Sequence, residues 1–267
     1  MRKKIGFIGC GNMGGALATA VSKTNDYEIF LSDVSKQKAQ DLSLKINAGV
    51  CEAKDIAGEC DYIFLGVKPQ TMAELLDSIS SILKNRTDRF ILVTMAAGLK
   101  ISSFNEMLGV KMPIIRIMPN IPVSVGEGMI IYSPCKAITD DDINEFSNML
   151  KFAGRLDKIS EELIDAGCAI SGCGPAFVYM FLESVAKAGN ECGLESQKAT
   201  EYAAQTLIGA AKLMLQSGKS PETLRKEVCS PKGATIEGVI SLENSQFDSA
   251  VNNAVKASYN RTVELGK

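Results

Sequence analysis

The stretch KIGFIGCGNMG, residues 4–14, decides how the first part of this chain folds. Its first five residues form a short apolar strand, and Asn12–Ser22 has the apolar spacing of a helix. Gly9 would permit a tight turn, Gly11 would let a pyrophosphate approach the backbone, and Gly14 would let helix and strand pack closely. The stretch therefore predicts a dinucleotide-binding turn with phosphates at the helix N-terminus. A glycine turn without ligand is the alternative, and the strand–turn–helix context disfavours it.

The second strand, Tyr27–Ser32, ends next to Asp33, nineteen residues past Gly14. An acid here usually hydrogen-bonds the ribose of NAD and repels the extra phosphate of NADP. This favours NADH and leaves NADPH open. The alternative is a nearby phosphate pocket formed by Ser32, Ser35, Lys36 and Lys38, although the two lysines better fit an exposed helix face.

Apolar runs and helical stretches alternate up to about residue 158. Such runs suit a parallel sheet that is buried on both faces, so residues 1–160 are predicted to form an α/β Rossmann-like, doubly wound domain. The further strands and helices expected there are Ser35–Ile46, Asp61–Val67, Phe90–Met95, Ile114–Ile117, Gly128–Tyr132 and about Thr139–Phe152.

Residues 161–267 lack strand-like runs, and we expect an all-helical domain there. Its helices are predicted at Gly174–Cys192, Ser196–Gln216, Pro221–Glu227, Gly233–Leu242 and Ser245–Leu265. These helices are apolar on more than one face, as at residues 177–182. They could be buried against the first domain, but a homodimer is favoured because wide apolar stripes need cover.

Composition excludes several classes of protein. Lys and Arg total 29 against 31 Asp and Glu, which gives no electrostatic case for nucleic acid or an anionic membrane. We read no apolar run of membrane-span length and no signal peptide, so a cytoplasmic location is expected. The eight cysteines form no Cys-x-x-Cys, and there is no histidine. No metal site is expected, and Ser-His and Cys-His hydrolase mechanisms are excluded.

Four further motifs have both a functional and a structural interpretation. Val67-Lys68-Pro69 and Ala96-Ala97-Gly98 follow strands and should border the nicotinamide, or they merely end strands. Asn120, in a loop with two prolines, could hold substrate or cofactor, or equally cap a turn. The loop Ser230–Thr235 opens a helix and suits a small carboxylate, although an ordinary capped helix is the better explanation when this motif is taken by itself.

Together these motifs resemble the Δ1-pyrroline-5-carboxylate reductase family over essentially the whole chain. The most specific parts are Asp165, Ser171–Ala176, Gly209–Lys212 and Ser230–Thr235. The resemblance implies a helical dimerisation domain, with dimers sometimes forming decamers of five dimers. It also implies NAD(P)H-dependent reduction of a cyclic imine to L-proline, the last step of proline biosynthesis.

The resemblance also implies roles for single residues. Ser230, Ala234 and Thr235 would bind the substrate, with Thr235 as the catalytic residue, and Glu161 or its neighbour Glu162 would contact the substrate. The family's cofactor contacts would fall on Ile8, Gly9, Cys10, Gly11, Asn12, Met13, Gly14, Asp33, Val67, Lys68, Pro69, Ala96 and Ala97.

The chain departs from the family at three positions. Lys232 and Ala234 replace residues that are often Gly and Thr, and Ala53 replaces an asparagine that often contacts the adenosine side. Together with Asp33, the last change leaves specificity at the adenine end open.

Two other protein classes fit parts of the sequence. A β-hydroxyacid dehydrogenase would need a lysine base on the first long helix of the second domain. Ser171–Glu183 contains none, and Lys187 comes a turn later. An NAD(H)-binding redox sensor would not need the Ser230–Thr235 loop. A reductase of other cyclic imines stays open.

Overall fold

A computed structural model describes residues 2–266 of the chain and divides them into two compact units. The second unit is Gly174–Ala257, and the first unit comprises the described residues on either side of it. The expected boundary lies after residue 160, whereas residues 161–173 associate with the first unit. The reason is a set of polar contacts between this segment and the sheet, described below.

The first unit contains an eight-stranded sheet in the order β3-β2-β1-β4-β5-β6-β7-β8. All neighbouring strands are parallel except β6 and β7. Because the strand order reverses beside β1, the sheet has the switch point of a doubly wound fold, as predicted. The strands are β1 (Lys4–Ile8), β2 (Glu28–Ser32), β3 (Gly49–Val50), β4 (Tyr62–Leu65), β5 (Ile91–Thr94), β6 (Ile114–Met118), β7 (Gly128–Pro134) and β8 (Gly154–Lys158).

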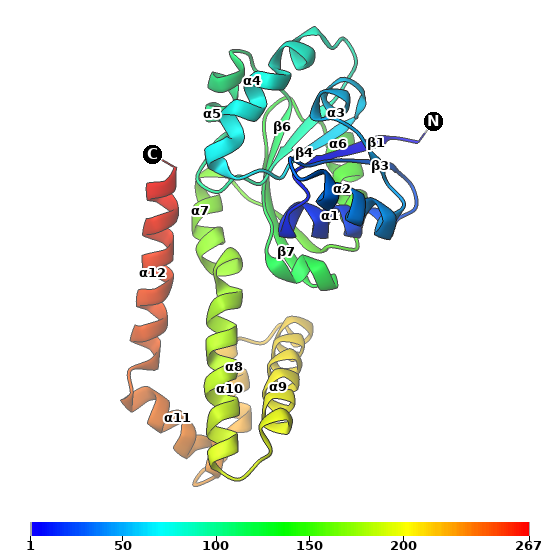
Figure 1. The fold of residues 1–267 in the computed structure, drawn as a ribbon. Helices are drawn as coiled ribbons and strands as arrows, with labels where there is room; N and C mark the ends of the chain where they lie inside the picture. Colours follow the sequence, from blue (N-terminus) through cyan, green and yellow to red (C-terminus); the bar gives the residue numbers. More distant parts are fainter. Residues whose placement is uncertain (1, 267) are drawn as a thin grey trace. The chain divides into compact units, whose positions relative to one another are not determined.

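Helices cover both faces of this sheet (Figure 1). On one face, Phe7 stacks on Phe64 with ring centroids 4.5 Å apart, beneath α1, α2 and α6. On the other face, Ile63 and Leu65 pack under α3, α4 and α5. The helices are α1 (Asn12–Ser22), α2 (Lys36–Ile46), α3 (Ala53–Glu59), α4 (Pro69–Asn85), α5 (Ile101–Leu108) and α6 (Asp140–Met149).

Two polar side chains of the sheet hold residues 161–173 in place. This segment forms a 3-10 turn (Glu161–Leu163), α7 (Ile164–Gly167) and a π-helical turn (Cys168–Gly172). Arg116 on β6 donates to Asp165 at 2.8 Å, and Asn120, just after β6, donates to the Ser171 carbonyl at 2.9 Å. Since Arg116 is fully buried, these bonds join the segment to the core of the first unit.

The second unit consists of helices, as predicted. They are α8 (Gly174–Glu191), α9 (Ser196–Ser217), α10 (Pro221–Val228), α11 (Ala234–Asn244) and the first part of α12 (Phe247–Leu265). Each begins and ends within two residues of its predicted bounds.

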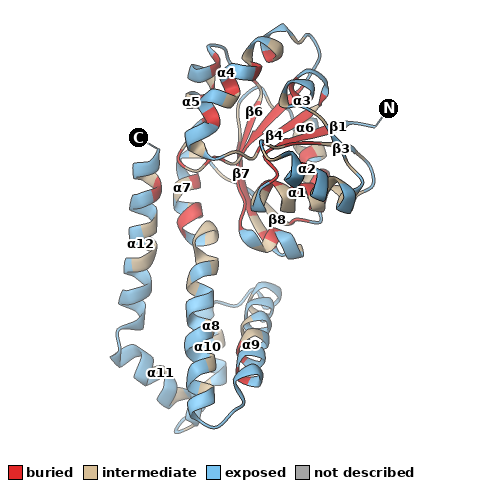
Figure 2. Ribbon diagram, viewed as in Figure 1, coloured by how far each residue is buried: buried red, intermediate tan, exposed pale blue. Residues whose placement is uncertain are grey.

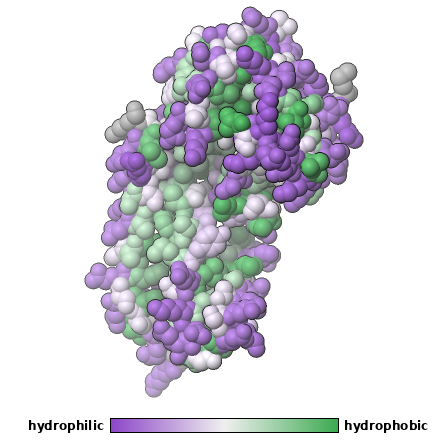
Figure 3. Space-filling model, in the orientation of Figure 1, coloured by the Kyte–Doolittle hydropathy of each residue, from purple (hydrophilic) through white to green (hydrophobic). Residues whose placement is uncertain are grey.

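The second unit has almost no interior of its own. Between Gly174 and Ala257, only Ala199 and Ala203 are buried (Figure 2). A groove of about 310 Å³ lies between α8 and α9 and is lined mainly by apolar side chains such as Phe181, Leu207 and Ala210. Figure 3 shows apolar surface spread along these helices. Their large exposed apolar residues include Val178, Tyr179, Met180, Val185, Tyr202, Ile208, Leu213, Leu215, Ile240 and Val251.

One helical stretch has the length and composition that could cross a membrane, which corrects the expectation that no such run exists. The continuous helix Glu161–Glu191 has 31 residues and a mean hydropathy of 1.3 over its most apolar window. The sequence shows no uninterrupted apolar run here, because glycines and polar residues are interspersed among the apolar ones. Only 11% of that window is buried within this chain, so its apolar side chains need cover from elsewhere.

Candidate dinucleotide and substrate sites

The glycine-rich turn has the backbone geometry that its sequence predicts. Gly9 has φ +103°, a conformation that L side chains rarely adopt. A Cβ atom at Gly14 would lie 2.0 Å from the carbonyl oxygen of Gly9, so only glycine lets α1 pack this closely on the turn. A Cβ atom at Gly11 would meet nothing within 4 Å. The backbone at Gly11 therefore faces open space, as the approach of a pyrophosphate requires.

The N-terminus of α1 has no side-chain cap, because its N-cap residue is Gly11. The first N–H groups of a helix have no partner inside the helix, and the helix dipole places partial positive charge at them. Asn12, Met13 and Gly14 thus present N–H groups at the end of the sheet where β1 stops. This arrangement suits a phosphate group.

Asp33 is held against the same turn. Its Oδ2 accepts the N–H of Cys10 at 2.7 Å, and its Oδ1 accepts the N–H of Ser35 at 2.8 Å. The carboxylate therefore links the turn after β1 to the turn after β2. Burial, and next the charge of Asp33, raises the pKa of the Cys10 thiol to about 11. Cys10 consequently stays neutral at physiological pH and contributes its backbone rather than a thiolate.

The loops after β4 and β5 lie along the same edge of the sheet. The N–H of Gly66 donates to the Ile8 carbonyl at 2.8 Å, and a Cβ atom at Gly66 would lie 2.7 Å from the carbonyl oxygen of Gly9. Pro69 is the first residue of α4, whose N-cap, Lys68, makes no side-chain cap bond. Ala96 is buried after β5.

The predicted cofactor residues thus follow four strands that are adjacent in the order β2-β1-β4-β5. The carboxyl ends of parallel strands meet at one edge, where ligands bind in open α/β sheets. The structure therefore brings together Ile8–Gly14, Asp33, Val67–Pro69 and Ala96–Ala97.

Asn120 has a structural role that the sequence left open. Its side chain donates to the Ser171 carbonyl and accepts the N–H of Met129 at 2.8 Å. Both ends of the amide are thus bonded to protein backbone. Asn120 is the N-cap of the 3-10 turn Ile121–Val125, but its side chain makes no cap bond there and instead anchors the loops that contain Ser171 and Met129.

Glu161 belongs to a buried ionic cluster in the first unit. Its Oε1 accepts the N–H of Ile101 at 2.7 Å and lies 3.5 Å from Nη1 of Arg116. Arg116 also pairs with Asp165, while its Nε and Nη1 atoms are buried without a hydrogen-bond partner. Sequence reasoning missed this cluster, because Arg116 lies more than forty residues before Glu161 and Asp165 in the chain.

The Ser230–Thr235 loop lies in the second unit and ends at the start of α11. The N–H of Gly233 donates to the Ser230 carbonyl at 3.0 Å, which closes a turn. Gly233 is the N-cap of α11 and offers no side-chain cap, so the first N–H groups of the helix are open to a ligand. Thr235 is the second residue of this helix and is exposed.

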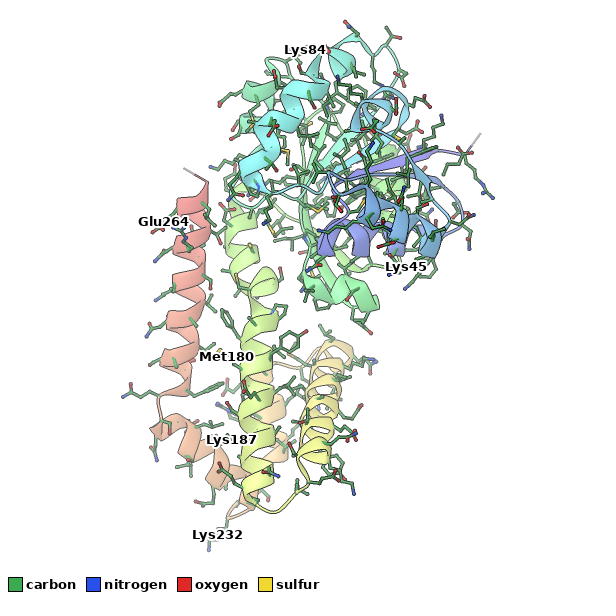
Figure 4. The ribbon with its side chains drawn as sticks, in the orientation of Figure 1. Lys45, Lys84, Met180, Lys187, Lys232 and Glu264 are labelled. Carbon is green, nitrogen blue, oxygen red and sulfur yellow. The ribbon has the colours of Figure 1, made fainter. Side chains whose placement is uncertain are left out.

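Lys232 adopts a left-handed conformation in the same loop, with φ +61° (Figure 4). Such a conformation is uncommon for residues other than glycine, which agrees with the expectation that the family often has glycine at this position.

The fold and the site define a class of protein, the nicotinamide-dinucleotide oxidoreductases. The defining features are the doubly wound sheet, the glycine-rich turn, the acid after β2 and two further loops at the same edge. Comparison with known families agrees. Residues 4–98 match the family described as NADP oxidoreductase coenzyme F420-dependent. Residues 161–265 match the family described as pyrroline-5-carboxylate reductase dimerisation.

Full-length relatives narrow the class. The pyrroline-5-carboxylate reductase of Escherichia coli is 35% identical over 100% of both chains. A pyrroline carboxylate reductase of Plasmodium falciparum, solved with NADP bound, has a TM-score of 0.88 and 32% identity over 99% of this chain and 98% of that one. The Coxiella burnetii enzyme has a TM-score of 0.91 and 27% identity over 100% of both chains. The chain belongs to the pyrroline-5-carboxylate reductase family.

Family membership confirms the expected class, an NAD(P)-dependent reductase, and the expected order of a Rossmann-like domain and a helical dimerisation domain. It also decides against the β-hydroxyacid dehydrogenase.

Proposed function

We propose that this chain reduces Δ1-pyrroline-5-carboxylate to L-proline, the last step of proline biosynthesis. Hydride would pass from C4 of NADH or NADPH to the imine carbon, and the protonated imine nitrogen becomes the ring amine. The strongest support is the full-length similarity to proteins named pyrroline-5-carboxylate reductase. In addition, the glycine-rich turn has the close packing that a dinucleotide-binding turn requires.

The first unit would bind the cofactor. The N–H groups at the start of α1 would hold the pyrophosphate, and Asp33 would accept a ribose hydroxyl while it holds Cys10 and Ser35 in place. The loops Val67–Pro69 and Ala96–Ala97 would border the nicotinamide. Nicotinamide supplies the hydride chemistry, and the protein supplies position.

In the second unit, the Ser230–Thr235 loop would bind the substrate. Its uncapped helix N-terminus suits the carboxylate, and the hydroxyls of Ser230 and Thr235 add donors. We assign to Thr235 the orientation of the ring nitrogen. Glu161 stays a proposed substrate contact, and since both of its observed contacts use Oε1, Oε2 is the atom that would meet the ligand.

This reaction suits a chain without histidine. A protonated imine is already electrophilic at carbon, so hydride transfer needs little general acid or base. The rate would come mainly from holding C4 of the nicotinamide close to the imine carbon. The neutral hydroxyl of Thr235 is then sufficient.

For the cofactor, we propose that NADH is preferred over NADPH. The carboxylate of Asp33 stands where the 2′-phosphate of NADPH would need positive charge. Lys36, the first residue of α2, is 3.2 Å from Oε1 of Glu52, which offsets its charge. The preference therefore rests on Asp33, while Lys38 is the other lysine of the phosphate pocket that the sequence offers as the alternative.

The dimerisation family supports a homo-oligomer, and we propose a homodimer that can assemble into a decamer of five dimers. The bare apolar helices of the second unit support the dimer, because a partner copy would cover them. We further propose that the enzyme works in the cytoplasm, as a biosynthetic enzyme without a need for nucleic acid or membrane.

The test is an absorbance assay that follows oxidation of NADH and of NADPH with pyrroline-5-carboxylate. Oxidation of either confirms the activity, and the ratio of the two rates gives the preference. No oxidation of either would favour a protein that only binds the dinucleotide. Acyclic and other cyclic imines in the same assay define the substrate range.

Thr235→Ala should lower turnover more than it weakens cofactor binding, on the order of a hundredfold if orientation of the ring nitrogen matters. Thr235→Ser keeps the hydroxyl and is the matched control, with turnover close to that of the parent. Unchanged turnover in Thr235→Ala would remove Thr235 from the mechanism.

A further inference from the structure

The end of α12 meets the loop that follows β5. Gly98 has φ +78°, and a Cβ atom there would lie 2.7 Å from the backbone nitrogen of Gly266 and 2.9 Å from the carbonyl carbon of Leu265. Conversely, a Cβ atom at Gly266 would lie 2.4 Å from the carbonyl oxygen of Gly98. Two backbones can approach this closely only where both residues are glycine. Both positions belong to the first unit.

A second contact fixes the same end of α12. Thr262 is buried, and its hydroxyl donates to the Ser258 carbonyl at 3.0 Å. Thr262 also lies beside the thiol of Cys168 in the π-helical turn, where burial raises the pKa of that thiol and the Thr262 hydroxyl acts to lower it. Cys168 packs in a small apolar cluster with Ile164 and Ala97. The segment Thr262–Gly266, which we call the α12 end segment, therefore contacts the Ala96–Gly98 loop directly and also through Cys168.

The Ala96–Gly98 loop has few groups that could fix its conformation. Ala96, Ala97 and Gly98 have no side chain that could form a polar bond. The Ala96 N–H has one bond, to the Thr94 hydroxyl at 3.4 Å, which is long. Packing against another segment is thus what fixes the loop in place.

We propose that the α12 end segment positions the Ala96–Gly98 loop and thereby sets how tightly the nicotinamide end of the cofactor is held. This inference rests on the proposed function only in placing the nicotinamide beside Ala96 and Ala97. Loss of the segment would weaken the hold on nicotinamide, because a loop shifted by about 1 Å no longer fits the ring. The hold on the adenosine and pyrophosphate, at the turns after β1 and β2, would be unchanged.

The experiment measures the dissociation constants of NADH and of ADP-ribose, which lacks nicotinamide, for the purified full-length protein and its variants. Gly266→Ala places a methyl group against the Gly98 carbonyl. The matched control is Glu264→Ala on the same turn, where the side chain is exposed and pairs only with Arg261 (Figure 4). A second variant that ends after Val263 removes the contact without adding a group. Thermal unfolding confirms that each variant is folded.

We expect NADH binding to weaken on the order of tenfold in both test variants, with ADP-ribose binding and Glu264→Ala unchanged. The KM for NADH should rise by a similar factor. Equal losses for NADH and ADP-ribose, or no loss of NADH binding in folded variants, would overturn the proposal. Because both constants are measured without an imine, the result is independent of whether pyrroline-5-carboxylate is the substrate.

Discussion

The two units of this chain bury their apolar residues very differently. In the first unit, two layers of fully buried side chains fill both faces of the sheet, with Phe7 and Phe64 on one face and Leu65 and Met72 on the other. In the second unit, only Ala199 and Ala203 are buried, while large residues such as Met180 are mostly exposed. The first unit therefore has a core of its own, and the second must acquire one from a partner copy.

This difference indicates which unit can bind the cofactor and which unit depends on a partner copy. A rigid, internally packed sheet edge suits the cofactor, whose phosphates and ring need fixed backbone groups. Because the proposed substrate loop belongs to the helices that a second copy would complete, we expect substrate binding to depend on assembly. Both inferences can be tested by substituting residues in one unit and measuring assembly, cofactor binding or stability.

The largest effect on assembly and turnover is expected from Met180→Glu on α8, where the side chain is 67% exposed in the single chain (Figure 4). A charge at the centre of an apolar interface should cost about 2 kcal/mol or more, roughly a thirtyfold weaker dimer. Sedimentation should then show monomer, and turnover should fall while NADH binding persists.

The matched control is Leu44→Glu on α2, because Leu44 is also exposed but belongs to the first unit. This variant should stay dimeric and active. If Met180→Glu sediments as the parent does, the exposed face of α8 is not the interface.

The largest effect on stability concerns the ionic cluster that joins residues 161–173 to the sheet. Arg116→Met should destabilise the first unit by about 3–5 kcal/mol, because it leaves the carboxylates of Glu161 and Asp165 without their buried partner. Urea denaturation measures the change. Neutralising the acids as well, by Glu161→Gln and Asp165→Asn, should restore part of the loss.

Lys226→Met in the second unit is the matched control for an exposed ion pair, because Lys226 pairs with Glu222 on the exposed side of α10. It should cost less than about 0.5 kcal/mol. Equal costs for Arg116→Met and Lys226→Met would mean that the buried cluster does not hold the segment.

A smaller effect is expected at alkaline pH, and it should arise in the first unit. Burial raises the pKa of the thiols of Cys10 and Cys168 to about 11 and that of Cys60 to about 12, above the ordinary 9.0. In the unfolded chain these thiols lose protons near pH 9, whereas in the folded chain they keep them. The stability they contribute is thus complete below pH 9 and is lost as the pH rises through 11 to 12.

The urea midpoint should therefore be constant from pH 7 to about 8.5 and decline above pH 9. Cys60→Ala removes one of these thiols with a raised pKa and should make the decline shallower. A midpoint that is independent of pH up to 11 would show that these thiols ionise equally easily in the folded chain.

Much of the fold could be predicted from local patterns. The strand Lys4–Ile8 and the helix Asn12–Ser22 have the bounds expected from their apolar spacing. The sequence reading did not identify α3, α4, α5, β3 or β8. The sequence predicts that Pro69 follows a strand and borders the nicotinamide, but it does not predict that Pro69 occupies the first turn of α4, where its missing N–H costs nothing. Ser35 is the N-cap of α2, but its side chain forms no cap bond.

By itself the sequence determined the dinucleotide turn, the acid that follows β2 and the family. These depend on glycines and polar groups close together in the chain, whose backbone requirements are local: Gly9 for a positive φ and Gly14 for close packing. Only the tertiary structure decided that Asn120 is an anchor, that Arg116 binds two acids more than forty residues away, and that Gly98 meets Gly266. Such contacts form because folding brings residues that are far apart in the sequence together in the interior. The spacing of residues along the chain does not indicate which of them will meet.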